Sequence, residues 1–304
     1  MADLKVQKSE IAQHHEVFSA FDRWTGACPA GFSVNFLGVF TRDSFFTVSG
    51  QNTNSRYVVS EFPAFDEEYF EWIDLLEAVI AAKAEFRMIE LGAGYGRWSV
   101  NAAAALRQRD GLPYRLIAVE PEPTHFEWMK LHFKDNGLNS KRCKLIRAAV
   151  ADEDGPVWFY VGKPAEWYGQ AIAPVPDFSS RRFRRLHEIF ARKGVVQGYE
   201  VRKVKAVSFD RLLKGLTHVD LIDLDVQGTE LIVLSSAVEQ LSQKVKRVHI
   251  GTHGEEIESG LRTLFQNLGW TKLNDYACGS ESETPWGVIK FGDGVQTWIN
   301  PKLT

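Results

Sequence analysis

The stretch that decides the fold reads FRMIELGAGYGRWSV and spans residues 86–100. Residues 86–91 form a short apolar run typical of a buried strand, and the alanine-rich segment 97–109 is typical of a helix. Between them, Gly92, Gly94 and Gly96 let the chain turn tightly and leave room for a ligand against the backbone. A dinucleotide pyrophosphate loop has the spacing G-x-G-x-x-G, but the third residue after Gly94 is Arg97. The turn therefore favours a ligand without a pyrophosphate over a nicotinamide dinucleotide.

A carboxylate closes the next predicted strand. Residues 113–120 read PYRLIAVE, and Glu120 lies 26 residues after Gly94. Ligands of open α/β sheets bind beyond the carboxyl ends of the strands, where an acid can accept hydrogen bonds from both hydroxyls of a ribose. A glycine-rich turn alone fits plain packing equally well. The turn together with Glu120 predicts a nucleoside site.

Strands and helices alternate from residue 86 onward. This alternation predicts an α/β domain with a mainly parallel, doubly wound sheet that has helices on both faces. Further strands are expected at 144–152, 157–162, 200–207, 219–226, 244–253, 270–279 and 286–292. Further helices are expected from 125 to a stop at Asn136-Gly137, at 208–215 with Ser208 as the N-cap, at 228–241 and at 255–269.

Two regions lie outside this alternation. Residues 1–85 are expected to form an N-terminal α/β extension, with a small β element over 32–48 and 56–60 and a helix over 66–83. Within the main domain, 86–304, an inserted helical segment is expected at about 163–200. Its predicted substrate-binding residues are Trp167, Tyr168 and Gln170, because aromatic side chains beside a glycine in a loop often shape a pocket. Anchoring of the insertion onto the domain explains these residues equally well.

The composition is that of an ordinary globular chain. Hydrophobic residues make up 44% and charged residues 25%, which excludes disorder as the main state. A net charge of −3 argues against nucleic acid or an acidic membrane surface as a partner. The three cysteines are far apart and form no C-x-x-C pair, which argues against a disulfide framework or a thiolate zinc site. The sequence has no apolar run of ~20 residues and no signal peptide, so we expect a cytoplasmic protein.

One further stretch is distinctive. Residues 219–230 read VDLIDLDVQGTE, and VSFDRLL precedes them at 207–213. Together with the glycine turn and Glu120, they resemble the FkbM family of class I S-adenosylmethionine-dependent methyltransferases over roughly residues 86–292. The resemblance implies a Rossmann-like, seven-stranded sheet and S-adenosylmethionine as the cofactor. The cofactor-binding residues that it implies are Glu90, Gly92, Ala93, Gly94, Gly96, Glu120, Pro121, Ala149 and Val150. Asp223 departs from the family pattern, in which many members carry lysine.

Asp225 and His253 are the predicted catalytic residues. Asp225 follows a strand on the ligand side of the sheet, where it can act as a base, orient the acceptor or bind a divalent ion; helix capping ahead of Thr229 is the alternative. His253 lies beyond the next strand and suits a base because histidine titrates near neutrality, although a hydrogen-bonded loop histidine fits equally well. Asp223, Asp225 and His253 would form a metal site only if a divalent ion is required, and we do not favour a metal.

These observations predict a methyltransferase that O-methylates a hydroxyl or carboxyl group of a small molecule. A hydroxyl acceptor usually needs a general base, whereas a carboxylate acceptor needs none. The alternative is a non-catalytic module of the same fold that binds a nucleoside and serves in assembly. The expected partner is a small-molecule acceptor, with no nucleic acid and no membrane, and homo-oligomerisation stays open.

Overall fold

The structure is a computed structural model that describes residues 13–46, 53–109, 111–162, 164, 171–172, 195–196 and 199–304. Most of the insertion expected at 163–200 lies outside these residues, and so do Trp167, Tyr168 and Gln170. Within the described residues, no helix is long and apolar enough to cross a membrane.

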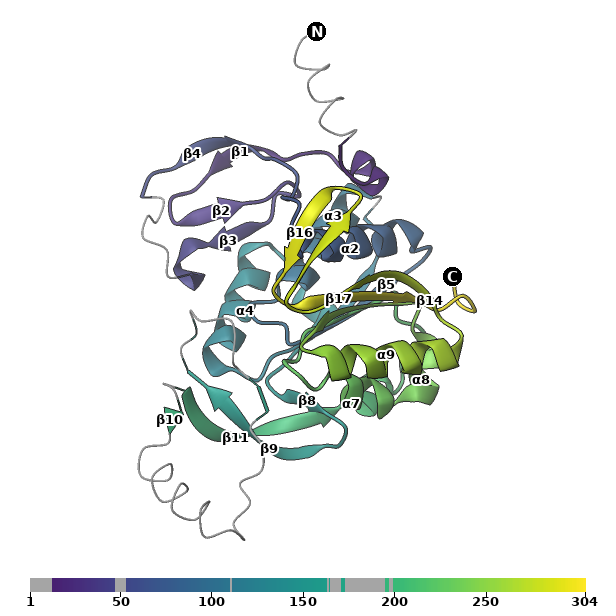
Figure 1. The fold of residues 1–304 in the computed structure, drawn as a ribbon. Coiled ribbons are helices and arrows are strands. Elements are labelled where there is room, and N and C mark those ends of the chain that lie inside the picture. Colours follow the sequence, from purple (N-terminus) through teal and green to yellow (C-terminus); the bar gives the residue numbers. More distant parts are fainter. Residues whose placement is uncertain are drawn as a thin grey trace.

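A seven-stranded sheet forms the centre of the molecule (Figure 1). Its strand order is β14-β17-β13-β12-β5-β6-β7, and only β17 runs antiparallel to its neighbours. The chain runs outward from β5 in one direction, returns, and runs outward from β12 in the other, so the strand order reverses between β5 and β12. The bounds are β5 Phe86–Leu91, β6 Tyr114–Val119, β7 Cys143–Ile146, β12 Leu221–Leu224, β13 Arg247–Thr252, β14 Thr271–Tyr276 and β17 Gly294–Ile299. The mainly parallel sheet predicted from the sequence is confirmed.

Helices cover both faces of this sheet (Figure 1). Successive strand residues point to opposite faces: Met88 packs against one hydrophobic cluster and Ile89 against the other. The helices of the first face are α2 Tyr69–Ala81, α3 Arg97–Gln108 and α4 Pro123–Asp135. Those of the second are α6 Phe209–Leu213, α7 Glu230–Ser235, α8 Val238–Lys244 and α9 Glu255–Leu268. This is the doubly wound arrangement that the alternation of strands and helices predicts.

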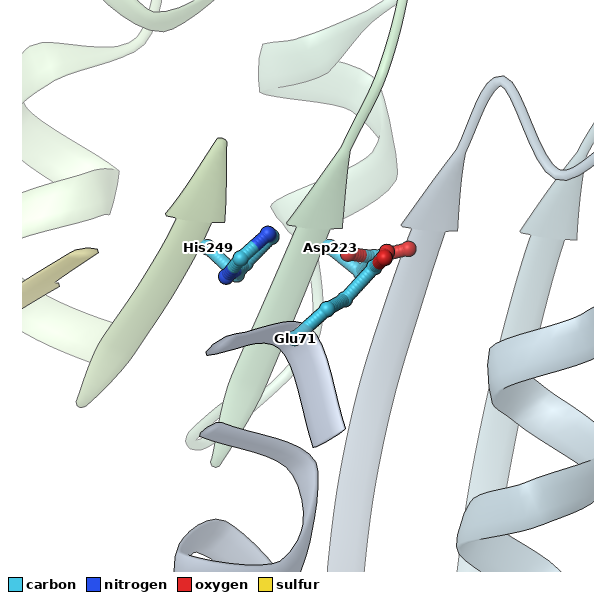
Figure 2. Close-up of side chains that lie close together, drawn as sticks. All are labelled: Glu71, Asp223 and His249. Carbon is cyan, nitrogen blue, oxygen red and sulfur yellow. The ribbon is translucent and has the colours of Figure 1, made fainter. Parts of the chain in front are cut away.

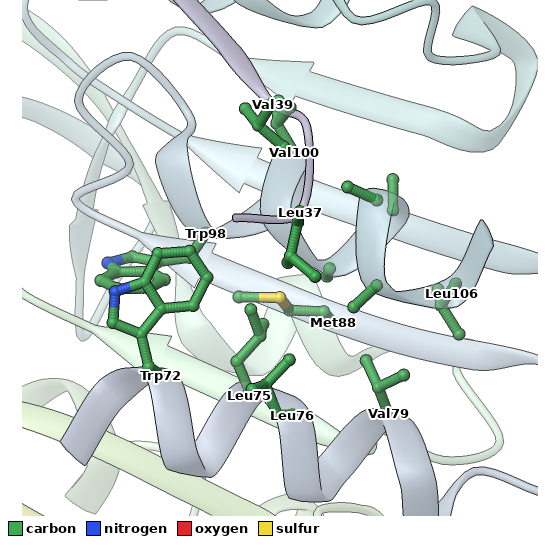
Figure 3. Close-up of a cluster of buried hydrophobic side chains, with 14 of the residues drawn as sticks. Leu37, Val39, Trp72, Leu75, Leu76, Val79, Met88, Trp98, Val100 and Leu106 are labelled. Atoms are coloured by element: carbon green, nitrogen blue, oxygen red, sulfur yellow. The ribbon is translucent and has the colours of Figure 1, made fainter. Parts of the chain in front are cut away.

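The N-terminal region contributes directly to the first face. Figure 3 shows Trp72, Leu75 and Leu76 of α2 packed with Trp98 of α3 around Met88 of β5. Helix α2 therefore covers the central sheet and brings its acidic side chains to it. The small β element is present as two separate pairs, β1 Thr25–Cys28 with β4 Arg56–Val59 and β2 Phe32–Val34 with β3 Phe40–Arg42, next to the short helices η1 Glu16–Ala20 and η2 Asp43–Phe45.

The single strand predicted over 144–152 is wrong. Residues 143–146 form β7 in the central sheet, and Ala149–Ala151 forms β8, which pairs with β11 in a second sheet. The apolar pattern continues across the break, but it does not reveal that the two halves pair with different partners. The second sheet also contains β9 Gly155–Val161, β10 Val195–Val196 and β11 Tyr199–Ser208, and the short helix η3 Ser140–Arg142 precedes β7.

Two other expectations change in detail. The helix predicted over 228–241 is divided into α7 and α8, where the Ser236 hydroxyl donates a hydrogen bond to the Val233 carbonyl and the backbone leaves helical geometry at Ala237. Ser208 caps α6 as predicted, since its hydroxyl oxygen accepts from the Arg211 N–H at 3.3 Å.

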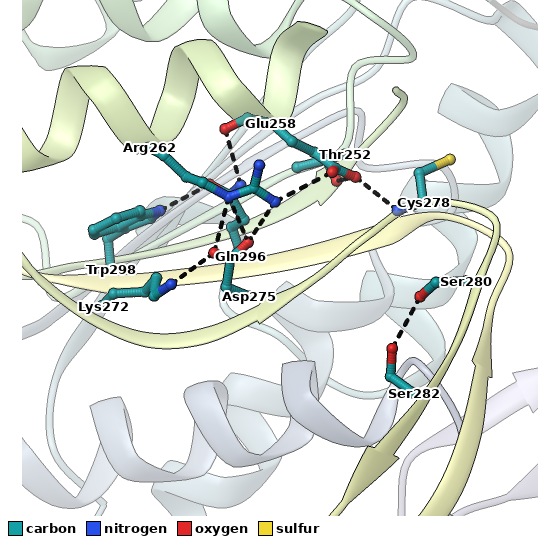
Figure 4. A network of polar contacts seen from close by, with 10 residues as sticks. All are labelled: Thr252, Glu258, Arg262, Lys272, Asp275, Cys278, Ser280, Ser282, Gln296 and Trp298. Carbon is teal, nitrogen blue, oxygen red and sulfur yellow. Dashed lines mark hydrogen bonds and ion pairs between the residues drawn. The ribbon is translucent and has the colours of Figure 1, made fainter. Parts of the chain in front are cut away.

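The C-terminal strands include two that the sequence pattern missed. The predicted strand β16, Gly287–Phe291, forms a hairpin with the unpredicted β15, Ser280–Thr284, and the unpredicted β17 completes the central sheet. Figure 4 shows the polar contacts that join α9 to β14: Arg262 pairs with Asp275, and Glu258 accepts from the backbone N–H of Cys278. The Cys278 thiol in turn donates to the carbonyl of Gly292, which precedes Asp293 in the turn before β17.

Candidate functional site

A cleft of about 330 Å³ opens at the carboxyl ends of β5, β6, β12 and β13. It lies at the point where the strand order reverses, which is where open α/β sheets bind ligands. The predicted residues that line it are Glu90, Gly92, Ala93, Gly94, Glu120, Pro121, Ala149, Val150, Asp223 and Asp225. Gly96 and His253 are not among the residues that line the cleft.

The glycine turn is built for close packing as well as for a ligand. Gly92 has a φ of +80°, and a Cβ there would lie 1.6 Å from the backbone carbonyl oxygen of Asp225. Gly96 has a φ of +74°, and a Cβ there would lie 2.4 Å from the ring of Phe133. Two of the three glycines therefore let β12 and α4 approach the turn. The remaining one, Gly94, presents its backbone N–H to the cleft side.

Glu120 ties the glycine turn to the end of β6. One carboxylate oxygen accepts from the Gly94 N–H at 2.7 Å and the other accepts from the Glu122 N–H at 2.7 Å. Each oxygen keeps further lone pairs that can accept from a ligand. Burial raises the pKa of Glu120 to about 8, against the two backbone hydrogen bonds, so a ligand that donates hydrogen bonds would restore the carboxylate.

Glu90 lines the cleft, and its carboxylate also binds the backbone at the start of α3. Its two carboxylate oxygens accept from the backbone N–H groups of Trp98 and Ser99, at 3.0 and 2.9 Å. The N–H groups in the first turn of α3 have no carbonyl partner within the helix, and Glu90 supplies their acceptor. Glu90 therefore holds the start of α3 against the end of β5. Burial and the charge of Asp223 raise the pKa of Glu90 to about 8.

Asp225 and His253 lie together as predicted. The imidazole Nε2 is 3.5 Å from Asp225 Oδ1, and Nδ1 is 2.8 Å from Glu230 Oε1. Glu230 is completely buried and also accepts from the Gly228 N–H, so it fixes the orientation of the ring. Nε2 is buried and makes no hydrogen bond within the described residues, with Asp293 on its other side at 3.5 Å. Glu230 and Asp293 were not identified from the sequence.

The neighbouring charges and the burial of His253 and Asp225 determine the pKa of each side chain. Burial opposes protonation of His253, but the hydrogen bond with Glu230 and the nearby carboxylates outweigh it and raise its pKa to about 9. Dehydration within the cleft raises the pKa of Asp225 to about 6, although 49% of its side chain is open to the cleft and solvent weakens the effect. At neutral pH, His253 is therefore a cation and Asp225 an anion, which makes Asp225 the stronger candidate for a base.

The predicted metal set of Asp223, Asp225 and His253 is not one cluster. Asp223 lies within β12 and faces α2, whereas Asp225 follows the end of that strand at Leu224 and turns into the cleft. Alternation along a strand would place both carboxylates on one face, but β12 ends at Leu224, before Asp225. Instead, Asp223 meets Glu71 of α2 and His249 of β13 (Figure 2).

Acidic side chains dominate the cleft. Beyond the predicted residues, the lining contains Glu67, Glu68 and Glu71 from the start of α2, together with Asp293. Arg97 offsets part of this charge, since its guanidinium pairs with both carboxylate oxygens of Glu68. In the sequence, the acids at the start of the predicted 66–83 helix indicate only favourable charges near a helix N-terminus, and the pattern does not show that they face a cleft.

The protonated state of His253 has a measurable consequence. A histidine whose pKa rises from 6.5 to about 9 on folding stabilises the fold fully below pH 6.5, and this contribution is lost as the pH rises through 9. We expect the difference in unfolding free energy between the wild type and His253→Gln to shrink from pH 6.5 to pH 10. The change should reach up to about 3 kcal/mol, at roughly 1.4 kcal/mol per pKa unit. Urea denaturation at both pH values measures it, and a difference that does not vary with pH would contradict the assignment.

Comparison with known proteins agrees with this geometry. Residues 90–269, more than half of the chain, match the family model of the methyltransferase FkbM domain. A protein of Jannaschia sp. (strain CCS1), named "Putative methyltransferase", is 29% identical over 290 residues, which cover 93% of this chain and 97% of that protein.

Solved structures are more distant. A SAM-dependent methyltransferase from Agrobacterium tumefaciens aligns with a TM-score of 0.43 at 16% identity, over 90% of this chain and 71% of that one. A methyltransferase FkbM from Methylobacillus flagellatus KT aligns with a TM-score of 0.41 at 11% identity, over 77% and 55%. The assignment therefore rests on the sequence match, which confirms the resemblance found in residues 86–292. The chain belongs to the FkbM methyltransferase family.

Proposed function

We propose that this protein transfers a methyl group from S-adenosylmethionine to a hydroxyl or carboxyl oxygen of a small molecule. The observation that carries the proposal is the placement of Asp225 beside the Gly94–Glu120 pair, in one cleft at the reversal of strand order. Family membership supports methyl transfer and this cofactor. The choice of oxygen as the acceptor atom is our inference from the carboxylate next to the nucleoside site.

The residues of the cleft fit the cofactor. Glu120 has lone pairs for both ribose hydroxyls, and the buried side chains of Ala149 and Val150 offer an apolar surface for an adenine ring. The excess of carboxylates suits a ligand that carries a sulfonium and an ammonium group. When bound, the sulfonium supplies an electrophilic methyl group, so the chemistry belongs largely to the cofactor.

The work left to the chain is to position the acceptor and to remove its proton. Asp225 is ionised at neutral pH and open to the cleft, so it can accept the proton of an acceptor hydroxyl. His253 stays protonated, held by Glu230, and stabilises negative charge on that side of the cleft. A module that only binds a nucleoside would not require the half-exposed Asp225 carboxylate beside the His253 imidazolium, so this pair favours the catalytic function.

Glu120→Gln should weaken S-adenosylmethionine binding by roughly 10- to 100-fold, because a hydrogen bond to a charged acceptor is worth about 1.5–3 kcal/mol. Calorimetric titration measures the affinity. Glu127→Gln is the matched control, since Glu127 lies on α4 and pairs only at the surface with Lys130. Equal affinities for Glu120→Gln and the wild type would remove the ribose contact from the proposal.

Asp225→Asn should lower the turnover of a hydroxyl acceptor by about 10²–10⁴-fold, the usual contribution of a general base. Its affinity for S-adenosylmethionine should stay within about twofold of the wild type, because the ribose carboxylate is untouched. Mass spectrometry of candidate acceptors gives the rate. Cofactor binding without methylation of any acceptor by the wild type would favour the non-catalytic module, and unchanged turnover in the variant would exclude Asp225 as the base.

A further inference from the structure

Three potential metal ligands meet on the side of the sheet that faces α2. Glu71 comes from α2, Asp223 from β12 and His249 from β13, and one ligand atom of each lies within 4.8 Å of the others (Figure 2). Asp223 and His249 occupy paired positions on adjacent parallel strands, so the sheet itself sets their spacing. We propose that these three side chains bind a divalent transition-metal ion, of which Mn²⁺ and Zn²⁺ are the best candidates.

His249 is oriented as a ligand. Its Nδ1 lies 2.7 Å from Oδ2 of Asp74, a carboxylate that is completely buried. Asp74 is itself held by Arg247 at 2.6 Å and by the Thr297 hydroxyl at 2.5 Å, so it stays ionised and the Nδ1 of His249 carries the hydrogen. A carboxylate behind the imidazole is the usual arrangement at metal-binding histidines. Nε2 has no hydrogen-bond partner among the described residues, so it is the ring atom available to a metal ion.

Asp223 is a buried carboxyl group, 4% exposed, that is hydrogen-bonded to the carboxyl group of Glu71. No backbone N–H and no basic side chain of the described part of the chain donates a hydrogen bond to it. Its neighbour is the carboxyl group of Glu71, which is also without a cation: Arg97 pairs with Glu68 and Arg247 with Asp74. Two adjacent carboxyl groups in this position need either a shared proton or a cation.

The proton is the competing occupant. The carboxyl groups of Glu71 and Asp223 are hydrogen-bonded to each other, so a proton shared between them is the alternative to a cation at this place. A divalent ion would displace this proton and add the Nε2 lone pair of His249 as a third ligand.

The donor set selects the class of metal. One imidazole nitrogen with two carboxylates suits Mn²⁺, Zn²⁺ and related ions, whereas Mg²⁺ and Ca²⁺ prefer sites made of oxygen alone. All three side chains also line the cleft, so an ion held by them would keep coordination positions open towards it. Water or an oxygen of the acceptor can occupy those positions.

Metal binding by these residues requires neither S-adenosylmethionine nor turnover, so it can be tested apart from the proposed function. The full-length protein is first stripped with a chelator and then titrated with MnCl₂, ZnCl₂ or MgCl₂ by calorimetry, with Mn²⁺ binding also followed by electron paramagnetic resonance. We expect one Mn²⁺ or Zn²⁺ ion per chain at micromolar affinity and Mg²⁺ at least about 100-fold weaker.

Variants locate the ion. Glu71→Gln and Asp223→Asn should each weaken binding by at least about tenfold, and Asp74→Asn by about 10- to 100-fold through the orientation of His249. Glu77→Gln, a change on the same helix at a residue that pairs with Arg247, should retain the wild-type affinity. Asp225→Asn should also retain it, because Asp225 belongs to the other cluster. Circular dichroism checks that each variant folds. If the buried Asp223→Asn or Asp74→Asn variant does not fold, Glu71→Gln still tests the proposal, because Glu71 is only half-buried.

The proposal is overturned if neither Mn²⁺ nor Zn²⁺ binds saturably below about 1 mM, a limit that corresponds to roughly 4 kcal/mol of binding free energy. It is equally overturned if ions bind with the same affinity to the Glu71→Gln and Asp223→Asn variants as to the wild type. Loss of binding only in Asp225→Asn would place the ion at the predicted Asp225–His253 group instead. Failure of S-adenosylmethionine to bind would contradict the proposed function and leave this result unaffected.

Discussion

The hydrogen bond that Gly94 donates to Glu120 joins the ends of two neighbouring parallel strands and gives the cleft its shape. It holds the glycine turn after β5 against the end of β6. The second oxygen of the same carboxylate accepts a hydrogen bond from the N–H of Glu122, the residue that caps the N-terminus of α4. Because Gly92 has no side chain, the glycine turn also leaves space for the backbone carbonyl of Asp225. A single buried carboxylate thus connects the side of the cleft where we propose that the nucleoside binds to the side where we propose that the proton is removed.

The second constraint is the negative charge of the cleft. The carboxylates form two groups, one beyond the end of β12 and one within the sheet. Beyond the end of β12, Asp225 and Asp293 surround a protonated His253 that Glu230 holds in place. Within the sheet, Asp223 and Glu71 adjoin His249, whose orientation Asp74 fixes. Asp223 and Asp225 are only two residues apart along the chain, yet their carboxyl groups have different partners. Asp225 adjoins an imidazolium, whereas Asp223 shares a proton with Glu71 or, as we propose, binds a metal ion.

The parts of the structure that depend on local pattern were predictable from the sequence. Strand β5, the glycine turn, Glu120 and the N-cap at Ser208 all follow from residue type and spacing. What the pattern did not reveal is pairing over long distances. Examples are the division of 144–152 between two sheets, the addition of β17 beside β13, and the contact between Glu71 and Asp223, which lie 152 positions apart in the sequence. Asp74 offered one signal, because an acid between Ile73 and Leu75 on a buried helix face requires a partner.

The central claim is that the Gly94–Glu120 pair holds the nucleoside of the cofactor, with its sulfur directed towards Asp225. The most direct measurement is a crystal structure of the protein with S-adenosylhomocysteine. We predict both ribose hydroxyls within hydrogen-bond distance of the Glu120 carboxylate and the sulfur on the Asp225 side of the cleft. A nucleoside bound elsewhere, or a ribose that makes no contact with Glu120, would contradict the account.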